Sequence, residues 1–265
     1  MKNLNILTRL GFFWQRRVHA INYTLRNPLR VLSSMFDPLS LYSKYFFYSP
    51  RYLTDYENYD VRSGLERCKV AYINLSHRTD RNVSILDEFA SVGIKDATRI
   101  NAVQRRNGAE GCSASHFYAL QSFRNSNSDL FMVCEDDCSF IVDADALSKV
   151  IEEFFRNPKL DVLCLAFRVT NFRKKIKISN SLKITNSSRT TACYVLKPHM
   201  IDPLMDVAKR SETSLAAGGN AQIFALDVLW KELQSKYIFC VPSTRTAKQI
   251  SSYSDIEQKN VSYRV

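Results

Sequence analysis

The apolar run Leu130-Phe131-Met132-Val133-Cys134 leads directly into three consecutive acids, Glu135-Asp136-Asp137. The apolar run is typical of a buried strand, and the acids then stand at the end of that strand. Three carboxylates in such a place repel one another and lose solvation, so a positive partner, most simply a divalent cation, would stabilise them. The alternative is a solvated acidic turn. The first interpretation predicts metal-dependent chemistry on phosphate.

A second strand followed by a polar turn lies upstream. Residues 70–75 are mostly apolar, residues 76–81 are polar and charged, and residues 83–92 have a helix-like pattern. In open α/β sheets the loop at the carboxyl end of a parallel strand supplies ligand contacts. Arg78 and Arg81 in this turn are therefore placed to meet anions.

Several motifs in this order and spacing resemble glycosyltransferase family 25, which includes bacterial lipooligosaccharide galactosyltransferases and procollagen galactosyltransferases. The resemblance covers residues 69–242. The matching motifs are Ile73-Asn74-Leu75, Arg78, Asp80-Arg81, Arg99-Ile100-Asn101-Ala102-Val103, Gly111-Cys112, Ser115-His116 and Glu135-Asp136-Asp137. Two segments depart from the family pattern, namely Gly108-Ala109-Glu110-Gly111 and the aromatic pair Phe117-Tyr118.

The resemblance implies an α/β fold of the GT-A type, a single Rossmann-type nucleotide-sugar domain with a mixed central sheet. It also implies a UDP-sugar donor and an oxygen-liganded Mn²⁺ or Mg²⁺ ion. In such enzymes the ion bridges the donor diphosphate and offsets charge on the leaving group. Asp137 is the first candidate for contact with the ion, and Asp136 and Glu135 support it.

The same resemblance implies which residues hold the donor. Asn74, Arg78 and Arg81 would bind nucleotide or phosphate, while Asp80 braces the arginines by bidentate pairing. His116 lies in the first turn of a helix predicted over residues 113–123, where it binds donor or acceptor, or is a structural histidine. The remaining donor-site candidates are Gly111, Ser115, Glu135 and Asp136.

The family inverts configuration at the anomeric carbon, so a carboxylate should take the proton of the acceptor hydroxyl. Asp227 corresponds to an acidic family position and is the leading candidate for this base. Asp255 is a second candidate, and it could instead cap the chain's tail or complete the donor site.

Three classes of function are consistent with these observations. The first is an inverting transferase that moves a hexose, galactose or glucose, to a lipopolysaccharide or other cell-surface glycan. The second is a non-catalytic sugar- or partner-binding protein with the same fold. The third is a metal-dependent phosphoesterase or nucleotidyltransferase, because acidic strand ends also serve phosphate chemistry.

The amino-terminal segment, residues 1–66, is predicted to be a helical basic arm before the catalytic domain, residues 67–265. Residues 1–54 contain eight Lys or Arg and one acid, Asp37, within a net charge of +11 for the 265-residue chain. Apolar and basic residues mixed in this way are typical of helices at anionic lipid surfaces, or of helices packed on their own domain. No apolar stretch is long enough to cross a bilayer, and no signal-peptide pattern is present, so we expect a cytoplasmic protein with peripheral membrane contact. The sequence contains no recognised nucleic-acid-binding module.

The seven cysteines show no zinc-ligand spacing. Cys134 and Cys138 bracket the acidic triplet, but two thiols alone do not make a four-ligand site. Cysteines in apolar runs are ordinarily small buried thiols, and a reducing cytoplasm suits them. The cysteine spacing therefore does not predict a four-ligand zinc site.

Residues 168–189 are rich in Lys and Arg and contain turn-forming Asn-Ser pairs. A basic loop of this kind could hold an anionic acceptor or close over a diphosphate. A solvated loop or hairpin is the equally weighted alternative.

Overall fold

The computed structural model of this chain describes residues 63–169, 175–250, 252–254 and 259–261. The expected helical arm and its membrane contact fall almost wholly on residues 1–62 and lie outside the described residues. Asp255, the second candidate base, also lies outside them. The described residues belong almost entirely to the catalytic domain predicted from the sequence.

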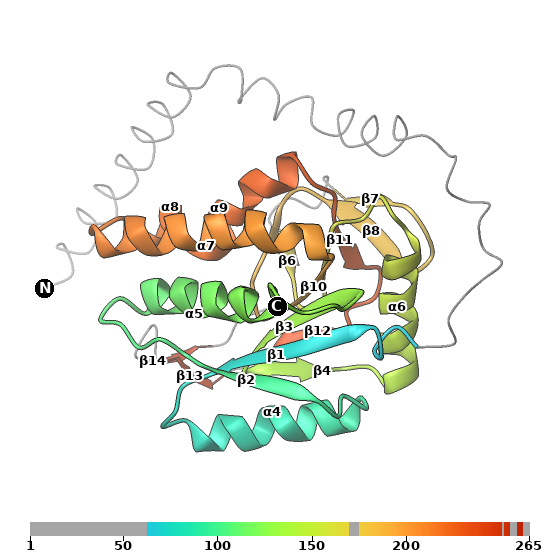
Figure 1. The fold of residues 1–265 in the computed structure, drawn as a ribbon, viewed down its shortest axis with the longest axis horizontal. Coiled ribbons are helices and arrows are strands. Elements are labelled where there is room, and N and C mark those ends of the chain that lie inside the picture. Colours follow the sequence, from blue (N-terminus) through green and yellow to red (C-terminus); the bar gives the residue numbers. More distant parts are fainter. Residues whose placement is uncertain (1–62, 170–174, 251, 255–258, 262–265) are drawn as a thin grey trace, which may run out of the picture. The chain divides into compact units, whose positions relative to one another are not determined.

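A mixed eight-stranded sheet forms the centre of the domain, in the order β2-β1-β3-β10-β5-β11-β8-β7 (Figure 1). β10 pairs antiparallel with both β3 and β5, whereas β2, β1 and β3 are parallel neighbours, as are β5 and β11. The strands are β1 (Cys68–Asn74), β2 (Ala97–Asn101), β3 (Leu130–Glu135), β5 (Val162–Cys164), β7 (Lys175–Lys177), β8 (Leu182–Thr185), β10 (Cys193–Leu196) and β11 (Phe239–Pro242). The predicted fold class, α/β with a mixed central sheet, is confirmed.

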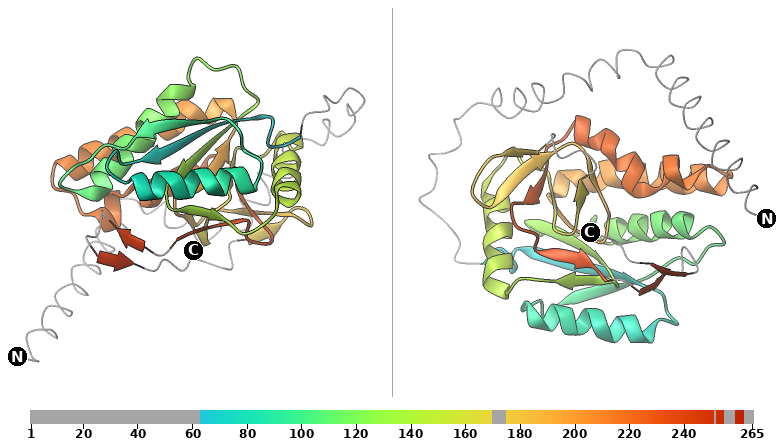
Figure 2. Two further views of the ribbon diagram at one scale, coloured as in Figure 1. Left: turned by 90° about the horizontal axis from the view of Figure 1, so that it is seen from below. Right: turned by 180° about the vertical axis from the view of Figure 1, so that it is seen from behind.

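Helices cover both faces of the sheet. α5 and α7 lie side by side on one face, and α4 lies along the other (Figures 1 and 2). The helices are α4 (Thr79–Ser91), α5 (Gly108–Phe123), α6 (Ala144–Arg156), α7 (Ile201–Ala216), α8 (Ala221–Phe224) and α9 (Leu226–Leu229), with 3₁₀ turns η3 (Pro198–Met200) and η4 (Trp230–Ser235). Each long helix buries only part of its residues, as expected of helices that pack on a sheet.

Helix α5 begins five residues before the start expected from the sequence. The side chain of Asn107 accepts a hydrogen bond from the backbone N–H of Ala109 at 3.1 Å, which satisfies one of the free donors of the first turn. The added first turn places Gly111 inside the helix.

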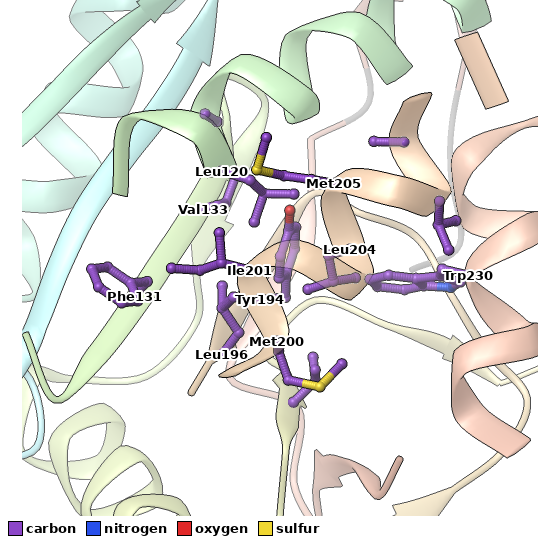
Figure 3. Close-up of a cluster of buried hydrophobic side chains, with 14 of the residues drawn as sticks. Leu120, Phe131, Val133, Tyr194, Leu196, Met200, Ile201, Leu204, Met205 and Trp230 are labelled. Carbon is purple, nitrogen blue, oxygen red and sulfur yellow. The ribbon is translucent and has the colours of Figure 1, made fainter. Parts of the chain in front are cut away.

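The core beneath α5 and α7 is aromatic and aliphatic. Figure 3 shows Phe131 and Val133 of β3 and Tyr194 of β10 among side chains from both helices and from η4. Trp230 contacts Tyr194 edge-on, with ring centroids 5.7 Å apart. Burying one such side chain contributes about 1.5–3 kcal/mol, so this layer holds the helices on the sheet.

Three small antiparallel pairs complete the domain: β4 (Cys138–Phe140) with β12 (Ala247–Gln249), β6 (Arg168–Val169) with β9 (Ser188–Arg189), and β13 (Ser252–Ser254) with β14 (Lys259–Val261). β12 brings Gln249 beside the acidic triplet. The basic segment over residues 168–189 forms short strands, including the β7–β8 hairpin at the edge of the central sheet. Within the described residues, the structure contains no helix both long and apolar enough to span a bilayer.

Candidate active site

The acidic triplet occupies the end of β3 and the turn into β4. β1 is parallel to β3, with Ile73 opposite Glu135, so Asn74 at the end of β1 lies beside Asp136. The backbone N–H of Asp136 donates to the carbonyl of Ile73 at 3.1 Å. The ends of the two strands therefore meet at one edge of the sheet.

Asp136 is fully engaged by protein groups. One carboxylate oxygen accepts from Asn74 Nδ2 at 2.7 Å, and the other accepts from Arg81 at 2.9 Å. Asn74 in turn accepts from Arg99 of β2 at 2.7 Å. Burial raises the pKa of Asp136 above the ordinary value, and the contacts with Asn74 and Arg81 oppose this effect only in part. The motif that contains Arg99 is part of the family resemblance, but the sequence predicts no role for Arg99 itself.

Asp137 is compensated less completely. Its Oδ2 accepts from Gln249 at 2.9 Å and lies 3.7 Å from Arg81, whereas its Oδ1 is buried without a hydrogen-bond partner. Burial, followed by the negative charge of Glu135, raises the pKa of Asp137 to about 7. A buried carboxylate oxygen without a partner fits a hard divalent cation, which would supply the missing positive charge.

Glu135 faces the α5 side of the sheet. Its Oε1 accepts from Thr191 at 2.7 Å and lies 3.1 Å from Nε2 of His116. Burial opposes ionisation of Glu135, but the hydrogen bond and charge of His116 hold its pKa below the ordinary value. The other ring nitrogen of His116 lies 3.1 Å from the hydroxyl of Tyr194. Both nitrogens thus have partners inside the protein, as the structural alternative for this histidine requires.

Asp227 lies at the start of α9, on the same side of the sheet as Glu135. Burial raises its pKa, and the charge of Glu135 adds to this effect, while nearby Arg189 opposes it. Burial and then the charges of Glu135, Asp227 and Asp137 raise the pKa of the Cys112 thiol. The neighbouring residues Thr190 and Thr191 donate to Asp227 and Glu135 respectively, so the candidate base lies near the first residue of the triplet.

Thr190 connects this region to β10 and has an unusual backbone. Its φ angle is +80°, a value that residues with a Cβ rarely adopt and that costs about 1–3 kcal/mol. The strained residue directs its N–H toward Asp227 Oδ2, at 3.4 Å. No sequence signal marks Thr190, because threonine gives no hint of a left-handed conformation.

Gly111 and Ser115 hold the loop before α5 against the helix. A Cβ at Gly111 would stand 2.3 Å from the carbonyl oxygen of Val103, so only glycine permits this approach. Ser115 donates to the carbonyl of Gly111 at 2.7 Å and accepts from the N–H of Val103 at 2.8 Å. Their observed contacts are thus internal, and donor binding by either residue stays a prediction.

Arg78 and Asp80 form a bidentate pair, with distances of 3.0 and 2.8 Å. The hydrogen bonds from Arg78 lower the pKa of Asp80 to about 2. Asp80 thus braces Arg78, which is part of the expectation from the sequence that it braces both arginines. Arg81 instead contacts Asp136 and Asp137, so the two arginines are held by different carboxylates.

The triplet does not act as one ligand set. Among the described residues, the sets of three potential ligand atoms that lie within 4.8 Å of one another do not include Glu135, Asp136 and Asp137 together. The three side chains diverge, and Asp137 is the member with an unpartnered oxygen.

No protein-family model matches this sequence, and no curated protein matches it. Solved structures with a similar fold include A197 from STIV, with a TM-score of 0.43, 16% identity, and coverage of 73% of this chain and 92% of that chain. Another is the mannosyltransferase PcManGT from Pyrobaculum calidifontis in complex with GDP-Man and Mn²⁺, with a TM-score of 0.41, 9% identity, and coverage of 85% and 69%. A third is a glycosyltransferase involved in glycosylation of the major capsid of PBCV-1, with a TM-score of 0.38, 10% identity, and coverage of 67% and 95%. These similarities concern the fold alone.

An Asp137→Asn variant should be more stable than the native protein in EDTA at pH 8. The folded-state pKa of Asp137 is raised from 3.8 to about 7, so its ionisation lowers the free energy of unfolding as pH rises through that window. Removing the charge should raise the melting temperature by roughly 3 °C or more, and should abolish the increase produced by Mn²⁺. Thermal unfolding with and without Mn²⁺ measures both effects.

The matched control is Asp202→Asn, which changes an exposed carboxylate on α7. It should leave the response to Mn²⁺ unchanged. An Asp137→Asn protein that is less stable in EDTA and still responds to Mn²⁺ would remove Asp137 from the cation site.

Proposed function

We propose that this protein is a metal-dependent glycosyltransferase of the family 25 type that transfers a hexose, galactose or glucose, from a UDP-sugar with inversion. The proposed acceptor is a hydroxyl of a lipopolysaccharide or other cell-surface glycan. The observation that carries the proposal is the buried, unpartnered Oδ1 of Asp137 at the end of β3. Asp227 is linked to Glu135 of the same triplet through the adjacent residues Thr190 and Thr191. The family resemblance supplies the reaction class, and the site geometry agrees with it.

Asp137 would hold the cation, Mn²⁺ or Mg²⁺, with Glu135 and Asp136 as supporting charges. When bound, the ion would offset the charge that grows on the leaving nucleoside diphosphate. Asp136 contributes indirectly, because its contacts fix Asn74 and Arg81 next to the cation site. Glu135 contributes negative charge while Thr191 and His116 hold its carboxylate in place.

Arg78 and Arg81 would bind phosphate oxygens beside the ion. The guanidinium of Arg81 contacts both Asp136 and Asp137. A diphosphate bound next to Asp137 would therefore lie close to the guanidinium of Arg81. Arg78 stands at the start of α4, where the positive end of the helix dipole also favours an anion. The donor's negative charge would thus meet positive groups from the chain as well as from the cation.

Asp227 would act as the general base. Burial raises its pKa above the ordinary value, which makes the carboxylate a better proton acceptor than an exposed aspartate. The N–H of Thr190 points at one of its oxygens and orients the carboxylate. The acceptor hydroxyl would lose its proton to Asp227 as its oxygen attacks the anomeric carbon.

A non-catalytic binding protein is the second candidate. It is favoured by the internal pairing of Asp136, Glu135 and His116, which satisfies much of the site without any ligand. Ligand binding without turnover would support this candidate over the enzyme.

A thermal-shift screen of nucleotide sugars, with and without Mn²⁺, tests the proposed class. UDP-sugars should raise the melting temperature only when Mn²⁺ is present, by roughly 5–10 °C at a hundredfold excess over Kd. Mn²⁺ with the corresponding nucleoside, which lacks phosphate, is the control for binding through the base and ribose alone. Absence of any response to nucleotide sugars, together with cleavage of simple phosphate esters, would favour the phosphoesterase instead.

An Asp227→Asn variant should keep Mn²⁺-dependent donor binding and lose transfer. Removal of a general base lowers the rate by about 100- to 10,000-fold, whereas donor affinity should change little. Transfer kinetics and donor titration measure the two effects, and Asp202→Asn again serves as the exposed control. Near-normal transfer by Asp227→Asn with collapse in Asp255→Asn would move the base to Asp255.

The amino-terminal arm would bring the enzyme to the cytoplasmic face of a membrane that carries its acceptor. Its net basic charge and apolar residues suit an anionic lipid surface. Deletion of residues 1–54 should therefore reduce co-sedimentation with anionic vesicles and leave donor binding intact. Equal sedimentation of the two proteins would contradict membrane contact by the arm.

A further inference from the structure

Three cysteine thiols meet directly behind the acidic triplet. Cys134 of β3 and Cys193 of β10 face each other across the antiparallel pair, with their sulfurs 3.4 Å apart. Cys138 is the first residue of β4, and all three sulfurs lie within 4.8 Å of one another. The three residues are at most 1% exposed.

The register of the sheet explains this meeting. The N–H of Glu135 donates to the carbonyl of Ala192 at 2.8 Å, so the neighbouring pair, Cys134 and Cys193, occupies a position without mutual backbone hydrogen bonds. Side chains approach most closely at such positions. Cys134 points to the face opposite Glu135, and the turn through the triplet returns the chain with Cys138 on that face.

The sulfur positions fit a metal ion with three ligands. At a metal–sulfur distance of about 2.3 Å, the sulfurs of a trigonal planar site stand about 4.0 Å apart. The sulfurs of Cys134 and Cys193 are 3.4 Å apart, and no pair among the three is separated by more than 4.8 Å, so little movement would be needed. Thiolates select soft cations such as Cu⁺, whereas structural Zn²⁺ sites take four ligands. The described residues bring three thiols together here.

We propose that Cys134, Cys138 and Cys193 form a three-thiolate binding site for a soft monovalent cation, Cu⁺. The site is separate in chemistry from the oxygen-rich one at Asp137, and it does not depend on the glycosyltransferase proposal. A bound ion would cross-link β3, β4 and β10 at one point. Because Cys134 and Cys138 flank the triplet, that cross-link would fix the acidic turn from behind.

Anaerobic titration of the full-length protein with Cu⁺, in competition with a chromophoric Cu⁺ chelator, tests the site. One equivalent should bind per chain, and Cys138→Ser and Cys193→Ser should each weaken binding by at least about tenfold. Cys240→Ser is the matched control, because Cys240 is equally buried but lies outside the cluster. Circular dichroism establishes that each variant is folded.

X-ray absorption of the Cu⁺-loaded native protein gives a readout that needs no variant. Three sulfur neighbours at about 2.3 Å are expected. Two sulfurs, or nitrogen and oxygen neighbours, would overturn the proposal. So would unchanged affinity in Cys193→Ser, an equal loss in Cys240→Ser, or a Cys134–Cys193 disulfide that persists in the reduced, purified protein.

Discussion

The site depends on one buried carboxylate, that of Asp137, whose negative charge is only partly compensated by the residues around it. One of its oxygens is satisfied by Gln249, and the other lies inside the protein without a partner. The fold tolerates the charge only partly, as the raised pKa of Asp137 shows. Around it, Arg81 supplies partial compensation and Glu135 adds repulsion. A carboxylate held in this way would be stabilised by a bound cation, and the neighbouring residues leave its second oxygen available for one.

The two acids at the end of β3 and the start of the following turn, Glu135 and Asp136, divide the site into two halves. Asp136 points toward the groups that follow β1 and joins Asn74 and Arg81, which suit an anionic ligand. Glu135 points toward α5 and α9, where His116 and Asp227 lie. Glu135 ends β3 and Asp136 begins the turn into β4, so their side chains diverge, and Asp137 follows in the same turn. This geometry separates the proposed phosphate contacts from the proposed base without any additional domain.

The sequence predicted the parts of the fold that depend on local pattern. The apolar run before Glu135 forms the expected buried strand, and the mixed α/β class is as expected. The sequence did not predict contacts made by distant segments. Gln249 reaches Asp137 through a short strand pair far along the chain, and no periodic pattern marks that pairing. Cys193 joins Cys134 because of strand register, which spacing rules for cysteines cannot detect. Divergence within the triplet also results from the turn geometry, and not from the identity of its residues.

β10 runs opposite to both of its neighbours, β3 and β5. A strand inserted antiparallel between β3 and β5 presents its beginning at the edge where its neighbours end. Thr190 and Thr191, which lead into it, thus stand opposite the turns that would bind phosphate. Insertions or substitutions at Thr190 and Thr191 can therefore change that side of the site. The contacts within the turns on the opposite side would stay the same. A change in ligand specificity on the side of Thr190 and Thr191 would not require changes in the phosphate-binding turns.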